Sequence, residues 1–240
     1  MPSRFVRLSS ALLLLAAATA PAIAQGASKA PAPKAADGWK WLFNGTSMDA
    51  WRGFKMTTMP EGWSIVDGTL AKNKPVEDLV SKEQFGNFEL EFEWKLGKEG
   101  NSGVFYRATE EETKVYWTAT EYQLLDDANA PDGRNKLTSA AANYGLYPPT
   151  MAMTKPADQW NTARIIVRGN HAEHWLNGMK VVEYEYWSPD YTAKEKASKF
   201  AEHPLYGKAT KGVIAIQGDH NGALALRNIR IREISAKEQK

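Results

Sequence analysis

RIIVRGNHAEHWLNGMKVVEYEY, residues 164–186, holds three apolar strand-like runs separated by two short turns. The turns are Gly169-Asn170 and Asn177-Gly178, and both residue types accept the backbone angles that tight hairpin turns require. The stretch therefore predicts an antiparallel meander of three strands. No helix-length segment separates these strands, so the pattern argues against the crossovers of a parallel sheet.

The same kind of pattern continues on both sides of the meander. Large apolar residues alternate with charged ones over 88–95, which predicts a half-buried strand with one solvated face. Asp67-Gly68 predicts a tight hairpin between 63–66 and 69–71. The last strands are expected at 213–217 and 223–234.

Many short strands without βαβ alternation predict an all-β fold, a two-sheet antiparallel β-sandwich of jelly-roll type. One short helix is expected in the long loop after the meander. Residues 192–202 are good helix formers and end before Pro204.

The first 36 residues do not share this pattern. Arg4 and Arg7 precede an apolar run, and Ala22-Ile23-Ala24 is a small-x-small cleavage site, so residues 1–24 are predicted to be a secretory signal peptide. Residues 25–36 are predicted to be a flexible Ala/Pro linker, and 37–236 one folded domain. We therefore expect an exported protein, periplasmic or secreted.

Composition limits the partners of this chain. Removal of residues 1–24 takes away two Arg and no acid, so the net charge falls from +2 to 0, which gives no sign of a nucleic-acid partner. The apolar run of the signal is too short for a permanent anchor, and no integral membrane segment is expected in the mature chain. The chain has no cysteine, so its stability has to come from a hydrophobic core.

Polar residues occupy positions on a central strand that a buried strand normally gives to apolar ones. In TEYQLLDD, residues 120–127, Glu121 and Gln123 share one face of the strand, and Asp126 and Asp127 follow where it ends. An ordinary solvated face is the alternative interpretation. Two further strands also carry polar residues, Asn101 and Arg107 on one parity of 101–107, and Gln217 at the end of 213–217. Such convergence is typical of a polyol-binding site.

Two aromatic residues and one histidine complete the candidate site. Trp117 and Tyr144 lie on irregular segments beside the polar strands, where their rings are expected to contact a sugar. His220 lies in a polar loop directly after a buried strand. Motifs for metal binding, nucleophilic catalysis and phosphate binding are absent from the sequence. No cofactor is evident, and a requirement for a divalent metal ion stays open.

Seven short segments resemble, in order, the 3-keto-disaccharide hydrolase domain family. They are GWKWLFNG (38–45) with Trp51, NSGVFYR (101–107), EYQLLD (121–126), QWN (159–161), LNG (176–178), GVIAIQ (212–217) and RNI (227–229). The resemblance implies a concanavalin A-like jelly roll that acts on sugars oxidised at C3. It implies site-lining roles for Asn101, Arg107, Glu121, Gln123, Asp126 and Gln217.

In this family the glycosidic bond is thought to break by elimination across C1–C2, with or without rehydration. Such chemistry requires a base near the C2 proton and a cationic or hydrogen-bonding group at the enolate oxygen. Glu121 or His220 is expected to be the base, and Arg107 with Asn101 to hold the enolate oxygen. Asp126 or Asp127 is expected to assist the leaving group or to hold a metal. The segment GDHN (218–221) is shifted by one residue from the family's Asp-His-Gly, which leaves the role of His220 open.

Two alternative functions remain at this point. A lectin-like module needs amides and stacking rings without an ionisable base. An ordinary glycoside hydrolase needs two carboxylates across the groove, for which Glu121 and Asp127 are the candidates. In each case the expected partner is a glycoside or oligosaccharide. The sugar, its anomer and the oligomeric state stay open.

Overall fold

The structure of the protein is a computed structural model. Met1 and residues 38–235 are the residues that it describes. The predicted signal peptide, apart from Met1, and the predicted linker lie outside the described residues, as do the two ends of the predicted domain at 37 and 236.

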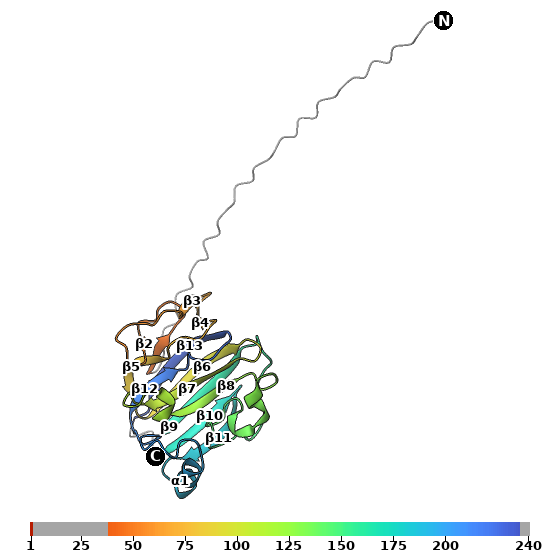
Figure 1. Ribbon diagram of the computed structural model, residues 1–240. Coiled ribbons are helices and arrows are strands. Elements are labelled where there is room, and N and C mark those ends of the chain that lie inside the picture. The colour runs from red at the N-terminus through yellow and green to blue at the C-terminus, as the bar shows by residue number, and fades with distance from the viewer. Residues whose placement is uncertain (2–37, 236–240) are drawn as a thin grey trace. The chain divides into compact units, whose positions relative to one another are not determined.

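Two antiparallel sheets make up the folded part of the chain (Figure 1). The larger sheet has the order β11 (Met179–Glu185), β10 (His171–Leu176), β9 (Asn161–Arg168), β6 (Phe88–Leu96), β13 (Leu224–Glu233), β4 (Thr69–Lys72) and β3 (Ser64–Val66), with β1 (Trp39–Phe43) also paired to β13. The smaller sheet has the order β2 (Trp51–Gly53), β5 (Leu79–Phe85), β12 (Gly212–Ile216), β7 (Asn101–Ala108) and β8 (Thr120–Leu125). The predicted all-β, two-sheet fold is confirmed.

The predicted meander forms β9, β10 and β11. Its second turn has Asn177 at φ 49° and Gly178 at φ 86°, the left-handed region that a type I′ hairpin turn needs. Asp67 and Gly68 adopt the same region, at φ 48° and 73°, between β3 and β4. These turns fix the register that sends one side of each strand into the core.

The main core lies between the sheets. Alternate residues of β6 point inward, and its Phe92 meets Tyr122 of β8 edge to face at 5.8 Å. The charged side of β6 was expected to be an ordinary solvated face, but its side chains are more buried and form ion pairs. Glu89 is only 2% exposed because Arg164 and Arg232 pair with it from the neighbouring strands.

The smaller sheet also buries part of its outer face. A second apolar cluster includes Phe105 of β7, Val213 and Ala215 of β12, and Val115 in the segment that follows β7. That segment covers one end of the outer face and leaves a hollow beside β8. The candidate site lies in this hollow, where the outer face of the smaller sheet is not covered.

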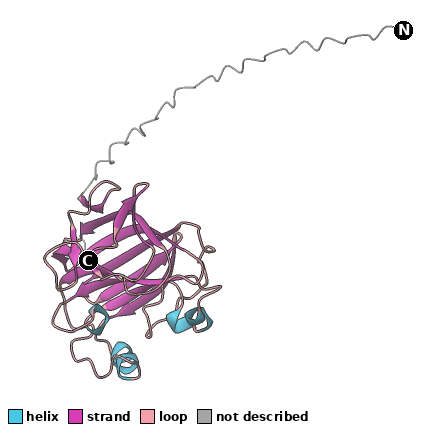
Figure 2. Cartoon of the chain, turned by 45° about the horizontal axis from the view of Figure 1, so that its top comes forward, coloured by secondary structure: helices cyan, strands magenta, loops and turns pink. Residues whose placement is uncertain are grey.

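The described part of the chain has one α-helix, as predicted, but it begins and ends earlier than expected. Helix α1 is Pro189–Lys196, not 192–202, because Ser188 caps its first turn by accepting from the Tyr191 amide at 3.1 Å. Within 38–235 there are also three 3-10 helices, η1 (Val115–Trp117), η2 (Pro131–Arg134) and η3 (Lys136–Thr138). The helical segments lie beside the ends of the sheets and not between them (Figure 2).

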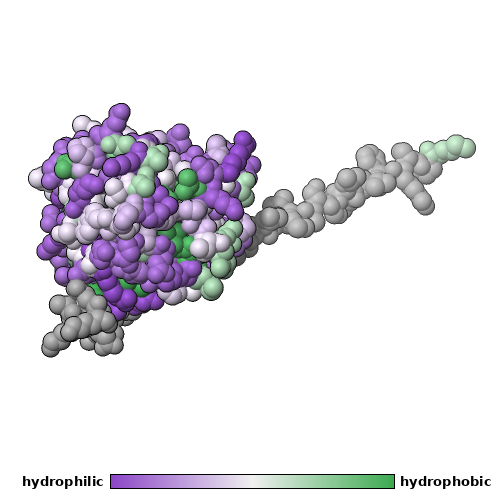
Figure 3. Space-filling view, turned by 90° about the horizontal axis from the view of Figure 1, so that it is seen from below, coloured by the Kyte–Doolittle hydropathy of each residue, from purple (hydrophilic) through white to green (hydrophobic). Residues whose placement is uncertain are grey.

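Few large apolar side chains are exposed in the part of the chain that the structure describes. Figure 3 shows a face that is mostly hydrophilic, with small separate hydrophobic patches. Among the described residues, no helix is both long and apolar enough to cross a bilayer.

Candidate functional site

The candidate site is built on the outer face of the five-stranded sheet, where two polar residues of β8 and one that follows β12 lie on either side of β7. On β8, Glu121 pairs with Phe105 and Gln123 pairs with Gly103 of β7. Directly after β12, the backbone N–H of Gln217 donates to the backbone carbonyl oxygen of Gly103 at 2.9 Å. Gln123 and Gln217 therefore lie on either side of Gly103, a residue with no side chain between them.

These residues line a cavity of about 210 Å³. It brings together seven of the predicted site residues, namely Asn101, Trp117, Glu121, Gln123, Tyr144, Gln217 and His220. They come from two strands and three connecting segments that are far apart in the sequence.

Glu121 is the most unusual group of the cavity. Its side chain is 6% exposed, and burial raises its pKa to about 8, against an opposing effect of the Lys199 ammonium. Further carboxylates, including Asp78, raise the pKa as well. Glu121 can therefore hold or accept a proton near neutral pH.

The two glutamines offer unused acceptors. Gln123 is 1% exposed and Gln217 5%, and neither side-chain oxygen has a hydrogen-bond partner among the described residues. The Gln123 side-chain nitrogen donates to the Thr138 carbonyl at 3.2 Å, which fixes the amide orientation. Buried acceptors without a partner are costly, so these atoms indicate a ligand that donates hydrogen bonds, as a sugar hydroxyl does.

Aromatic rings form part of the lining, but they are not all free to stack on a ligand. One face of Trp117 stacks on His203 at 3.7 Å with the planes 6° apart. Tyr116 meets the Trp117 ring edge to face. Burial raises the pKa of Tyr144 to about 12, so its hydroxyl stays protonated near neutral pH. One face of Trp117 is thus already occupied by His203, and Tyr144 offers a neutral phenol to a ligand.

Four lining residues were missed by sequence reasoning: Tyr116, Asp132, Lys199 and Asp219. Tyr116 adjoins the predicted Trp117, which was a usable signal. Lys199 lies in a lysine-rich segment that resembles a solvated helix, and nothing local distinguishes it from Lys194 or Lys196. Asp132 lies in the short 3-10 helix η2 and Asp219 on a loop, and the sequence does not determine where either segment packs.

Arg107 does not reach this cavity, which corrects the expectation that it holds the enolate oxygen. In the β7–β12 pair, Val213 lies opposite Ala108 and Ala215 opposite Phe105, so β7 has one extra residue. This bulge puts Arg107 at φ 54° and breaks the alternation. The guanidinium instead donates to the carbonyl oxygens of Gly86 at 2.9 Å and Gly169 at 2.8 Å.

Asp126 and Asp127 are not in the cavity lining either, and both carboxylates have structural partners. Asp126 accepts from the Glu99 amide at 2.9 Å, and Asp127 accepts from the Ala140 amide and the Thr154 hydroxyl, each at 2.8 Å. The expected leaving-group or metal role is therefore not supported for either residue. Across Met1 and 38–235, no three of His, Cys, Asp and Glu gather as a metal-ligand group.

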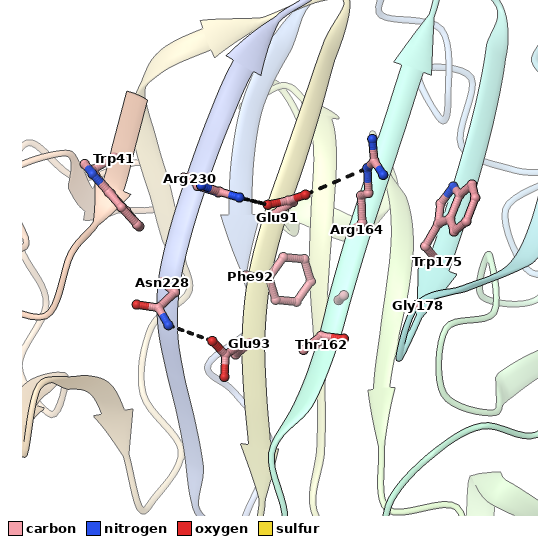
Figure 4. Close-up of a pocket in the computed structure, with 11 residues that line it drawn as sticks. Trp41, Glu91, Phe92, Glu93, Thr162, Arg164, Trp175, Gly178, Asn228 and Arg230 are labelled. Atoms are coloured by element: carbon pink, nitrogen blue, oxygen red, sulfur yellow. Dashed lines mark hydrogen bonds and ion pairs between the residues drawn. The ribbon is translucent and has the colours of Figure 1, made fainter. Parts of the chain in front are cut away.

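A larger hollow of about 510 Å³ lies over the eight-stranded sheet (Figure 4). Its charged residues are already paired with one another, since Arg230 and Arg164 flank Glu91, and Asn228 donates to Glu93 at 2.6 Å. The smaller cavity, in contrast, combines a buried carboxyl group with unpaired amide oxygens. It is the better candidate for chemistry.

Comparison with known proteins agrees with this assignment of the fold. Residues 38–232 match the family model for the 3-keto-alpha-glucoside-1,2-lyase-like domain. The chain is also similar to a 3-keto-disaccharide hydrolase from Bacteroides thetaiotaomicron, with 34% identity over 232 residues that cover 83% of this chain and 80% of the relative.

Solved structures show the same architecture. A crystal structure of a candidate glycosyl hydrolase from Parabacteroides distasonis has a TM-score of 0.77 and 29% identity, covering 82% of this chain and 94% of that one. An inactivated mutant of β-agarase B in complex with agaro-octaose has a TM-score of 0.50 and 12% identity, covering 78% and 85% of the two chains. The second likeness shows the fold alone. The expected concanavalin A-like jelly roll is confirmed.

Proposed function

Because the chain belongs to the 3-keto-alpha-glucoside-1,2-lyase-like domain family, we propose that it cleaves the glycosidic bond of glycosides whose sugar carries a ketone at C3. The cleavage is an elimination across C1–C2. Addition of water to the resulting double bond gives net hydrolysis.

The ketone makes this route chemically accessible. A carbonyl group at C3 acidifies the proton on C2, so a side-chain base is able to remove it. The electron pair of the C2–H bond moves into an enolate with its negative charge on the C3 oxygen. When the enolate collapses, the C3=O bond re-forms, the C1=C2 bond forms and the C1–O bond breaks. The leaving oxygen takes a proton from water, and the hydroxide that remains takes the C2 proton from the base.

The observation that carries the proposal is the Glu121 carboxyl group. It is buried at the base of the cavity, and its pKa is raised to about 8 by desolvation. A base with a pKa near the working pH is the most effective for general-base catalysis. The unpartnered oxygens of Gln123 and Gln217 beside it suit the hydroxyl groups of the same sugar.

The size of the cavity limits the part of the substrate that it encloses. Its volume of about 210 Å³ is below the roughly 300–1,000 Å³ that is typical of sites for drug-sized ligands. One oxidised sugar ring is therefore the natural occupant, with the leaving group toward solvent. The substrate class is a 3-keto-glycoside or 3-keto-disaccharide attacked at its terminal ring.

Replacement of Glu121 by Gln tests the proposal, because it keeps the shape of the side chain and removes the base. Turnover of a 3-keto-glucoside is expected to fall at least about a hundredfold, with binding largely kept. Wild-type kcat/KM is expected to rise with pH through about 8, because the base acts when deprotonated. The matched control is Glu83→Gln on β5, an exposed carboxyl group of the same sheet.

The same assays separate the alternatives. A glucoside and its 3-keto analogue are compared side by side, and turnover of the unoxidised glucoside at a similar rate favours an ordinary hydrolase. An active Glu121→Gln with an inactive His220→Ala transfers the base role to His220. Sugar binding without any turnover by the wild-type protein favours a lectin-like module.

A further inference from the structure

Lys199 brings a cation into the cavity from a segment remote from the polar strands. It follows α1, and although much of the residue is exposed, its ammonium group lies 4.3 Å from the centre of the Tyr144 ring and 5.6 Å from that of Tyr116. The neighbouring Phe200 is 1% exposed and stacks on Tyr206 at 3.9 Å. Lys199 is therefore attached to the core through its neighbour while its ammonium group reaches the site.

The charge of Lys199 is not neutralised by an ion pair. Across residues 38–235, no carboxylate oxygen lies within ion-pair distance of its ammonium group, whereas Asp219 of the cavity lining pairs with Lys114 at 3.7 Å. Glu121 and Asp132 are the cavity carboxylates that interact with Lys199 electrostatically. This positive charge lies near the base, has no carboxylate paired with it, and is therefore available to a ligand.

The proposed elimination requires such a charge, because the C3 oxygen becomes negative in the transition state. Arg107 cannot supply it, since its guanidinium is bonded to backbone carbonyls outside the cavity. We propose that the Lys199 ammonium group binds the C3 oxygen and stabilises the enolate, a role that rests on the proposed function. Lys199 donates a hydrogen bond and keeps its protons, Glu121 takes the C2 proton, and the electron balance of the elimination is unchanged.

The absence of cysteine from the whole chain makes an unusually specific test possible. In Lys199→Cys the new thiol is the single thiol of the protein, and 2-bromoethylamine converts it to an S-aminoethyl group that restores an ammonium at nearly the lysine position. Iodoacetamide adds a neutral group of similar size to the same sulfur. Lys196→Cys, at the exposed end of α1 and three residues away, is the matched control.

Turnover of a 3-keto-glucoside is measured for each protein before and after alkylation. Lys199→Cys is expected to lose at least about a hundredfold in kcat with a smaller change in KM, because the enolate charge is absent from the bound ground state. Aminoethylation is expected to recover at least tenfold, and iodoacetamide is expected to recover nothing. Lys196→Cys is expected to behave as wild type throughout.

Three results would overturn this role, and they differ from a failure of the proposed function. Lys199→Cys activity within threefold of wild type removes the need for the cation. Equal recovery with both reagents shows that the bulk of the side chain matters and its charge does not. A substrate adduct on Lys199 trapped by cyanoborohydride shows a covalent imine in place of a hydrogen-bonded ammonium. A wild-type protein that binds but never converts the 3-keto-glucoside contradicts the proposed function itself.

Discussion

At the scale of single residues, the cavity depends on a glycine that leaves room for a carboxyl group. A Cβ atom at Gly103 would lie 2.1 Å from the Glu121 Oε1 atom and 2.8 Å from its carboxyl carbon. The backbone of Gly103 is ordinary strand, so its conformation does not require glycine. The missing side chain is what allows the Glu121 carboxyl group to lie against the sheet.

Gly103→Ala is therefore expected to displace Glu121. Overpacking of this kind costs about 1–3 kcal/mol of stability, and kcat/KM on a 3-keto-glucoside is expected to fall more than tenfold because the base leaves its position. Thermal unfolding and steady-state kinetics check both effects. Gly97→Ala is the control, since a Cβ there meets its nearest neighbour, Ala223, at an ordinary 3.6 Å. A Gly103→Ala protein as active as Gly97→Ala would show that the carboxyl position is unimportant.

At the scale of elements, sequence periodicity predicted which strand side chains line the same cavity, because the strands that carry them are regular there. Glu121 and Gln123 project together from β8, and Asn101 lines the same cavity from β7, as period-two alternation requires. The same rule failed at Arg107, where a bulge inserts one residue into β7. Arginine is not a residue type that signals a left-handed backbone, so this bulge could not be predicted from the residue types.

The contacts of segments without regular structure could not be predicted from the sequence, for a different reason. Lys199 reaches the cavity because the chain after α1 packs Phe200 against Tyr206, a contact between side chains on an irregular path. Asp126 and Asp127 appeared functional because they follow the polar strand, yet each carboxylate accepts hydrogen bonds that hold loops in place. Such tertiary contacts decide which carboxylates and cations meet, and no periodicity encodes them.

The buried His174 shows how elements of the two sheets are joined. Its Nδ1 contacts the Ala141 carbonyl oxygen at 2.8 Å, and a carbonyl only accepts, so Nδ1 carries the proton. Nε2 then accepts from the Tyr106 hydroxyl at 2.7 Å, and the Tyr184 hydroxyl donates to Tyr106 at 2.6 Å. The network connects β10 and β11 of one sheet to β7 of the other, and it requires a neutral imidazole.

This network is expected to make the fold sensitive to acid. Burial lowers the pKa of His174 to about 4 from its usual 6.5, so the stabilisation is complete above pH 6.5 and is lost as the pH falls to 4. The loss is on the order of 3 kcal/mol at about 1.4 kcal/mol per pKa unit. In urea unfolding at pH 7 and pH 4, His174→Gln is expected to show a smaller difference between the two pH values than wild type. The exposed His220→Gln is the control, and an unchanged pH difference in His174→Gln would contradict the assignment.

At the scale of the whole molecule, the outer faces of the two sheets differ in charge pairing and in cover. The outer face of the eight-stranded sheet carries a ladder of paired charges across β6, β13 and β9, which keeps that face polar. The outer face of the five-stranded sheet is partly covered by loops and holds the cavity. Burial of Glu121 in that cavity opposes stability at high pH, because folding has to desolvate a carboxylate there. A stable core shared by both sheets offsets this cost.

Export of the protein is the last prediction, and it depends on residues 1–24, which lie outside the described residues except for Met1. Two arginines, an apolar run and Ala22-Ile23-Ala24 predict that the exported form begins at Gln25 and has a net charge of 0. The intact mass of protein recovered from the periplasm or medium of a bacterial host checks this start. Ala24→Asp is expected to block processing, since the cleavage site requires a small residue there, whereas Ile23→Gln at the intervening position is expected to be processed normally. Exported protein that still begins at Met1, or equal processing of both variants, would contradict the prediction.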